Sequence, residues 1–248
     1  MLDVAIEAAK AAGQLAYRYF KTQPKVSYKA DNSPVTRADI EAEKLTRKIV
    51  LKKFPDHGFY GEETGETQPH APYKWVVDPI DGTQAFIRGI SLWMTLVALL
   101  KDGKPIIGIS YSPSTGQLFV AEKSKGTYLN GKKTRVSKIK KIDEAFLVHG
   151  GIKSFKRQEK LEGLINLTEA VKASRGWTDG GYNLLLDARA DIYVSASEQI
   201  YDIAAPSILV EEAGGKFTDF DGKFSLISGN GVATNGFLHN QVLKILNS

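Results

Sequence analysis

The sequence predicts a layered α/β fold of the α+β kind, in which helices cover the faces of sheets. Three observations support this prediction. Two segments with helical spacing come first, short apolar runs separated by glycine and proline follow, and helical and strand-like segments alternate after about residue 156. A chain of 248 residues is long enough to bury a sizeable core, as one large domain or as two closely packed halves.

The first half of the chain begins with two predicted helices, residues 3–20 and 37–53, and Thr36 is the expected N-cap of the second helix. A series of strands is expected next. Their predicted ranges are 58–60, 74–78, 92–100, 105–111, 117–122 and 127–129. Asn130-Gly131 then predicts a hairpin turn, and the basic residues beside it are expected to lie on solvated strand edges.

The second half alternates helices with strands. Helices are predicted at 156–170 and 181–190, and a strand follows the second of them at 191–194. A further helix at 203–213 is expected to end at Gly214-Gly215, because glycine favours the left-handed conformation that stops a helix. The remaining predicted elements are strands at 216–219 and 231–233 and a short helix at 237–247.

Composition excludes several classes of protein. Hydrophobic residues make up 42% and charged residues 25%, which are ordinary values for a globular enzyme. No apolar run is long enough to cross a bilayer, and Asp3 and Glu7 interrupt the pattern that a signal peptide would need. We therefore expect a cytoplasmic protein that does not bind membranes. The absence of cysteine excludes disulfides and thiolate metal sites.

The net charge of +5 raises the possibility of a nucleic-acid partner, but the basic residues are scattered, so no nucleic acid is expected to bind. Mild positive charge also suits an enzyme that takes anionic substrates. The four histidines, His57, His70, His149 and His239, lack the spacing of metal ligands, and a zinc site is not expected. With no cysteine in the chain, any metal would be bound by oxygen or histidine ligands.

The most informative segment is Asp78-Pro79-Ile80-Asp81-Gly82-Thr83, which follows the apolar run Trp75-Val76-Val77. Two carboxylates thus end a predicted strand at the point where a helix can begin. Carboxylates bind Mg²⁺, and the free N–H groups of a starting helix favour an anion such as phosphate. From these residues alone a second interpretation stays open, in which the aspartates cap a helix and Pro79 and Gly82 form a turn.

Two further acidic positions support the metal interpretation. Glu62 and Glu63 lie where the predicted strand ending near residue 60 enters a loop, and adjacent carboxylates there need a cation or solvent. Asp202 lies at the start of a helix rich in small and apolar residues, where it could also be an N-cap. Each position alone leaves both interpretations open.

With these motifs in order, the chain resembles the inositol monophosphatase family, a group of Mg²⁺-dependent, lithium-sensitive phosphatases. The matching segments are Pro34-Val35-Thr36-Arg37-Ala38-Asp39, Gly61-Glu62-Glu63, Asp78-Pro79-Ile80-Asp81-Gly82-Thr83, Asp202-Ile203-Ala204-Ala205 and Glu212-Ala213-Gly214-Gly215. The resemblance implies an αβαβα sandwich of the inositol monophosphatase and fructose-1,6-bisphosphatase type. It also implies one unit over 1–248 with two packed halves, about 1–135 and 136–248, and a homodimer.

The resemblance also implies the roles of individual residues. Glu62, Asp78 and the carbonyl of Ile80 would bind a first Mg²⁺, and Asp78, Asp81 and Asp202 a second. Glu62 would also take part in catalysis, and with Glu63 it would order a weaker third ion through waters. Inhibition by Li⁺ would follow if this chain behaves as its family does.

Thr83 and Asp39 would activate the attacking water, because the threonine hydroxyl would link that water to the aspartate. From the sequence alone, Asp39 is instead a favourable first-turn carboxylate. The backbone N–H groups of Gly82 and Thr83 would bind phosphate oxygens, and Asp202 would also lie beside the substrate. Lys29 precedes these motifs, and it is either a site residue or a solvated surface lysine.

The residues that would contact the rest of the substrate are in the segment 175–183. Asp179, followed three residues later by Tyr182, and Tyr201 before Asp202 resemble the histidinol-phosphatase branch of the family. An acidic Asp179 would suit a cationic amino alcohol, so the predicted substrate is histidinol phosphate. Asp179 could instead cap the next helix, with Trp177 in the core.

Other functions stay open at this point. Inositol 1-phosphate is the second choice of substrate, and fructose-1,6-bisphosphate and 3′-phosphoadenosine phosphates come after it. A different class of function is a non-catalytic family member that binds RNA polymerase or RNA. The presence of every acidic ligand and of Thr83 favours an active enzyme.

Overall fold

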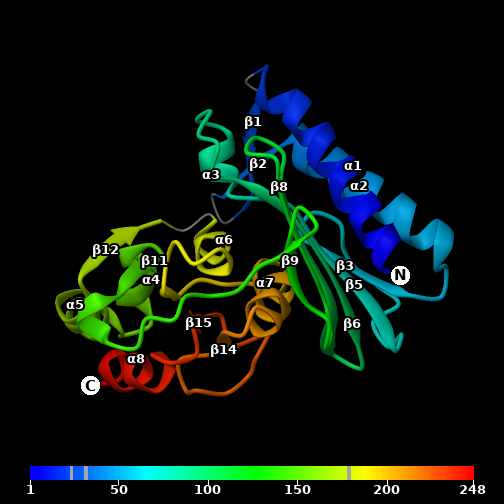
Figure 1. Ribbon diagram of the computed structural model, residues 1–248. Coiled ribbons are helices and arrows are strands. Elements are labelled where there is room, and N and C mark those ends of the chain that lie inside the picture. The colour runs from blue at the N-terminus through cyan, green and yellow to red at the C-terminus, as the bar shows by residue number, and fades with distance from the viewer. Residues whose placement is uncertain (23–24, 31–32, 178–179) are drawn as a thin grey trace.

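The computed structural model describes residues 1–248 apart from residues 23–24, 31–32 and 178–179. Its helices and sheets form five layers in the order helices, sheet, helices, sheet, helices (Figure 1). The predicted αβαβα order is therefore confirmed. Over the described ranges, no helix combines the length and the apolar character that a membrane span requires.

The first layer consists of α1 (Leu2–Phe20) and α2 (Arg37–Lys53), which pack on each other and on one face of the larger sheet. Small residues form the buried side of α1, and their size lets the helix approach the strands closely. They include Ala5, Ala8, Ala9, Ala12 and Ala16. The Thr36 hydroxyl accepts a hydrogen bond from the Ala38 N–H, so Thr36 caps α2 as predicted.

The larger sheet has eight strands. They are β3 (Gly58–Gly61), β4 (Gly65–Thr67), β5 (Tyr73–Asp81), β6 (Met94–Lys101), β7 (Lys104–Ser112), β8 (Gln117–Glu122), β9 (Gly126–Leu129) and β10 (Lys132–Lys133). Their order across the sheet is β10-β9-β8-β7-β6-β5-β3-β4. Neighbouring strands are antiparallel except for β3 and β5, which are parallel and therefore end side by side.

The predicted hairpin at Asn130-Gly131 joins β9 to β10, with Leu129 paired to Lys132. The backbone φ angles of Asn130 and Gly131 are 49° and 80°. Two-residue hairpins of this kind need positive φ at both central positions, which asparagine and glycine tolerate best. The hairpin prediction is confirmed.

The smaller sheet has five strands in the order β12-β11-β13-β15-β14. They are β11 (Phe146–His149), β12 (Ala173–Gly176), β13 (Ile192–Ser195), β14 (Lys216–Thr218) and β15 (Gly231–Thr234). Between the two sheets lie α6 (Gly181–Leu186) and α7 (Ile200–Glu212). The outer layer consists of α4 (Ile152–Arg157), α5 (Leu161–Ala170) and α8 (His239–Leu246). Because α7 contacts strands of both sheets, most of its surface is apolar and buried.

Three predicted helices differ from the structure. The helix expected at 156–170 is divided into α4 and α5, because Glu159 has a left-handed φ of 55° that a right-handed helix cannot accommodate. The helix expected at 181–190 ends at Leu186, before Ala188 at φ 61°. The helix expected from 203 starts at Ile200, where Gln199 and Asp202 form a capping box.

Some short elements are absent from the sequence-based prediction. They are β1 (Val26–Tyr28), β2 (Pro34–Thr36), β4, β10, β11, β12 and a 3-10 helix at Ile142–Glu144. Each has no more than four residues, which is too short to display a strand or helix periodicity. Two of them bear on the site: β1 and β2 pair with each other, and Lys29 follows β1 directly.

His239 links α8 to the smaller sheet. The residue is 1% exposed, with Nε2 2.9 Å from the Thr218 hydroxyl and Nδ1 3.1 Å from the Thr234 hydroxyl. The Thr218 hydroxyl donates to the Asp219 carbonyl, so it accepts a hydrogen bond from Nε2–H, and Nδ1 is left as the acceptor. This arrangement suits the neutral ring. Burial, together with a smaller effect of the charge of Lys216, lowers the pKa of His239 to about 4.

We expect His239 to weaken the fold as pH falls. The unfolded chain binds the proton more tightly, so the free energy of unfolding decreases between pH 6.5 and about pH 4. Above pH 6.5, the shifted pKa of His239 is expected to contribute about 2–3 kcal/mol to the free energy of unfolding. Denaturant unfolding at pH 7 and pH 4.5 measures it. A His239→Asn variant should lose less stability over this interval than wild type, and an equal loss in both would contradict the prediction.

Candidate metal centre

The site lies where the C-terminal ends of β3 and β5 meet the N-terminal ends of α2 and α7. β5 continues past its predicted end at residue 78, with a register shift between Asp78 and Asp81. Asp78 pairs with Leu96 and Asp81 with Met94, so β5 has one extra residue here. Residues three apart in a regular strand face opposite sides, and the extra residue brings both aspartates to the same face.

Asp78, Asp81 and Asp202 converge on one point. One oxygen from each carboxylate lies within 4.8 Å of the other two, and Asp78 is buried. Burial raises the pKa of Asp78 well above its usual range, and the negative charges of Glu62, Asp81 and Asp202 add to this effect. Three oxygen ligands with mutual repulsion fit a hard divalent cation, which would relieve that repulsion. Elsewhere in the described chain, no other group of three ligand side chains meets in this way.

Asp202 has two connections. It is the third residue of α7, and its Oδ2 accepts a 2.6 Å hydrogen bond from the Gln199 N–H. Gln199 is therefore the N-cap of the helix, and Asp202 is its capping-box partner. The alternative that Asp202 is itself the N-cap is therefore wrong. Its capping-box contact uses one carboxylate oxygen, and the residue also belongs to the acidic group.

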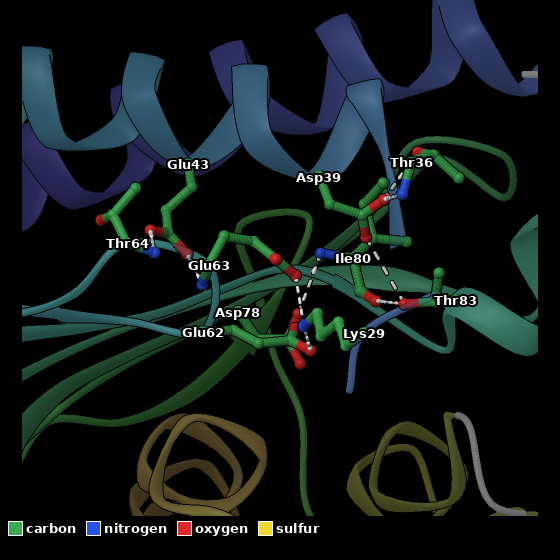
Figure 2. A network of polar contacts seen from close by, with 10 residues as sticks. All are labelled: Lys29, Thr36, Asp39, Glu43, Glu62, Glu63, Thr64, Asp78, Ile80 and Thr83. Carbon is green, nitrogen blue, oxygen red and sulfur yellow. Dashed lines mark hydrogen bonds and ion pairs between the residues drawn. The ribbon is translucent and has the colours of Figure 1, made fainter. Parts of the chain in front are cut away.

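Lys29 reaches the acidic loop after β3. Its Nζ lies 2.8 Å from Glu62 Oε1 and 2.7 Å from Glu63 Oε1 (Figure 2). Burial alone would lower the pKa of Lys29, but the two carboxylate contacts outweigh burial and raise it. Burial raises the pKa of Glu63 to about 7, although its hydrogen bond to Lys29 opposes the shift. Of the two alternatives for Lys29, the solvated surface lysine is wrong.

The structure also brings Thr83 and Asp39 together, although 44 positions separate them in the sequence. The Thr83 hydroxyl lies 3.4 Å from Asp39 Oδ1 and 3.1 Å from the Ile80 carbonyl. The other carboxylate oxygen, Oδ2, accepts hydrogen bonds from the Thr36 N–H at 2.8 Å and the Thr36 hydroxyl at 2.6 Å. Asp39 thus keeps Oδ1 toward Thr83, while burial raises its pKa to about 6.

Gly82 and Thr83 start the short helix α3 (Thr83–Phe86) directly after β5. Gly82 has a φ of 93°, a conformation that favours glycine, and this turn places the start of α3 beside the aspartates. The first N–H groups of a helix have no partner within it, so they are suitable donors to an anion. Phosphate binding by the N–H groups of Gly82 and Thr83 stays a prediction.

The predicted substrate side is only partly visible. Asp179, with its predicted role and its alternative role as a cap, lies outside the described residues. Trp177 is 43% exposed and therefore does not pack in the core. Arg88 and Arg175 donate to their near neighbours Gln84 and Ser174.

Glu43 is missing from the sequence-based prediction. This fully buried carboxylate on α2 accepts hydrogen bonds from the N–H groups of Glu63 and Thr64. One signal was available: Glu43 follows Asp39 by four positions, so both lie on the same side of the helix.

Comparison with known proteins identifies close relatives of this chain. The sequence pattern of the inositol monophosphatase family matches residues 1–248. A histidinol-phosphatase from Mycobacterium tuberculosis is 34% identical over 254 residues, covering 100% of this chain and 98% of that protein. An inositol-1-monophosphatase from Caulobacter vibrioides is 33% identical over 252 residues, covering 97% and 98%. The solved structure of the Thermotoga maritima IMPase has a TM-score of 0.90 at 28% identity, covering 99% and 96%.

Proposed function

This chain belongs to the inositol monophosphatase family and is a phosphoric monoester hydrolase, and from that premise we propose that it is a Mg²⁺-dependent histidinol-phosphate phosphatase. The observation that supports this proposal most directly is the convergence of Asp78, Asp81 and Asp202 within 4.8 Å. Oxygen ligands at this separation suit Mg²⁺ together with phosphate oxygens.

The residues around this point would hold two Mg²⁺ ions and, through waters, a weaker third ion. Glu62, Asp78 and the Ile80 carbonyl would bind the first, and Asp78, Asp81 and Asp202 the second. When bound, Mg²⁺ supplies positive charge to the phosphoryl oxygens and lowers the pKa of water. Li⁺ inhibition belongs to the same proposal.

The residues of the chain would orient the reacting groups. A water that donates to the Thr83 hydroxyl lets that hydroxyl donate in turn to Asp39 Oδ1, 3.4 Å away. Thr36 keeps the Asp39 carboxylate oriented through its two contacts with Oδ2. The N–H groups of Gly82 and Thr83 would hold the phosphoryl oxygens for in-line attack.

The choice of histidinol phosphate has two supports. Relatives at about 34% identity that cover nearly the whole chain are named histidinol-phosphatase. A cationic amino alcohol also suits the acidic Asp179 that we propose on the substrate side. Inositol 1-phosphate is the main alternative, since a relative at 33% identity is named inositol-1-monophosphatase.

We expect the efficiency kcat/KM for histidinol phosphate to exceed that for inositol 1-phosphate and fructose-1,6-bisphosphate by at least about tenfold, with Mg²⁺ required throughout. An ammonium paired with Asp179 would contribute roughly 1.5–3 kcal/mol. Phosphate release measured for all three substrates tests this. Higher efficiency on inositol 1-phosphate would reverse the assignment, and no hydrolysis of any of them would favour a non-catalytic family member.

An Asp179→Asn variant tests the proposed role of Asp179 in substrate choice. It should reduce kcat/KM on histidinol phosphate by about 10–100-fold and leave inositol 1-phosphate nearly unchanged, because hydroxyl groups can pair with either side chain. Equal losses on both substrates would assign Asp179 to a structural role.

The homodimer, the cytoplasmic location and the absence of a nucleic-acid partner stay predictions of the sequence.

A further inference from the structure

We infer that Glu43 is a positioning residue for metal binding, which holds the turn at Glu62-Glu63 so that both carboxylates face the acidic group. The inference rests on the proposed Mg²⁺-dependent function. Glu43 acts through the backbone of the turn, and in the structure its carboxylate contacts N–H groups of that turn.

Both carboxylate oxygens of Glu43 accept hydrogen bonds from the turn. Oε2 accepts the Glu63 N–H at 2.8 Å, and Oε1 accepts the Thr64 N–H at 2.7 Å (Figure 2). Glu43 is 0% exposed. A buried carboxylate is costly unless it is hydrogen-bonded, so the two donors and the acid depend on one another.

Gly61 provides an independent sign of this close approach. A Cβ atom at Gly61 would lie 2.3 Å from both Cδ and Oε1 of Glu43. The carboxylate thus occupies the space that a side chain at residue 61 would fill. A larger residue at position 61 would therefore force the Glu43 carboxylate to move away from its two N–H donors.

Glu62 is held from both sides as a result. Its own N–H donates to the Val77 carbonyl at 3.3 Å, and the next two N–H groups donate to Glu43. Val77 immediately precedes Asp78, so the turn is tied to the strand that carries the central carboxylate. The same helix face that presents Asp39 to Thr83 therefore also sets the position of Glu62.

The experiment compares Mg²⁺ binding to wild type, Glu43→Gln and Glu43→Asp by titration calorimetry. Glutamine keeps the length of the side chain but offers one acceptor oxygen in place of two. Aspartate keeps the charge but is one methylene shorter. Residues that support metal ligands typically contribute 10–100-fold to affinity, so we expect both variants to bind Mg²⁺ about 10–100-fold more weakly.

Two further measurements separate positioning from general stability. Amide hydrogen exchange at Glu63 and Thr64 should become faster in both variants. The value of kcat at saturating Mg²⁺ should stay within about fivefold of wild type, because the chemical groups are intact, while the Mg²⁺ concentration for half-maximal activity rises.

Thr46→Val is the matched control. Thr46 is buried on the same helix, and its hydroxyl donates only to the Ala42 carbonyl at 3.0 Å among the contacts described. This variant tests a local loss of helix stability and should leave Mg²⁺ affinity unchanged. Weakened Mg²⁺ binding in Thr46→Val comparable to that in the Glu43 variants would overturn the inference.

The outcomes also separate this inference from the proposed function. If wild type binds no Mg²⁺ and needs none for hydrolysis, the proposed function fails. If wild type binds Mg²⁺ and both Glu43 variants bind it equally well, the inference alone fails. Weaker binding in Glu43→Gln with normal binding in Glu43→Asp would assign the effect to charge and would likewise overturn positioning.

Discussion

Replacing Asp78 with asparagine is expected to reduce turnover by about 10³-fold or more, which corresponds to a barrier increase of about 4 kcal/mol. Asp78 lies at the centre of the acidic group, with Glu62, Asp81 and Asp202 all close enough to raise its pKa. The proposed function assigns it to both Mg²⁺ ions. An amide contributes no charge to either ion, so binding of both should weaken.

The fold should survive this change. Asp78 Oδ1 accepts a 2.9 Å hydrogen bond from the Ile80 N–H, and the carbonyl oxygen of asparagine can replace it. Removing a buried charge that its neighbours repel should leave the midpoint of thermal unfolding equal or higher when a chelator is present. Kinetics with saturating Mg²⁺ and thermal melts with chelator measure the two effects.

Asp187→Asn is a suitable control for Asp78→Asn, because Asp187 pairs with Arg189 outside the acidic group. It should retain wild-type turnover. Turnover of Asp78→Asn within about tenfold of wild type, a difference of about 1.4 kcal/mol, would contradict the role of Asp78.

Local sequence patterns were sufficient to place the three aspartates at a strand end and a helix start. An apolar run that ends in a carboxylate predicts a strand end, and small and apolar residues after Asp202 predict a helix start. The contact of Thr83 with Asp39 could not be derived in this way, because it joins segments 44 positions apart. It followed only from the resemblance to the family.

The contacts of Glu43 and Lys29 could not be predicted from local sequence patterns. In the sequence, Glu43 looks like an ordinary acidic residue of an amphipathic helix. Its proposed role depends on hydrogen bonds from two N–H groups about 20 residues further along the chain. Lys29 lies beside the short strand β1, and both of its partners are more than 30 positions away. Contacts of α2 and of the segment after β1 with the turn that follows β3 bring these residues to one place. The four-residue spacing of Asp39 and Glu43 predicts that they share a helix face, but it does not predict which residues they contact.

Replacing Thr83 with alanine is the second change with a large expected effect. Removing a positioned proton-transfer partner typically reduces the rate by about 10²–10⁴-fold, and we expect kcat to fall within this range. Mg²⁺ affinity should stay within about threefold of wild type. The hydroxyl lies 3.1 Å from the Ile80 carbonyl oxygen, and its removal leaves that oxygen available to a cation.

A Thr83→Ser variant separates the hydroxyl from the methyl group. Serine keeps an oxygen at the same position, so it should restore most of the rate lost in Thr83→Ala. Single-turnover kinetics and calorimetry with Mg²⁺ measure chemistry and binding independently. If Thr83→Ala lost Mg²⁺ binding while its single-turnover rate stayed unchanged, Thr83 would act on the Ile80 carbonyl and not on water. The proposal of water activation rests on the position of the Thr83 hydroxyl, which also lies 3.4 Å from Asp39 Oδ1 while Thr36 contacts the other carboxylate oxygen.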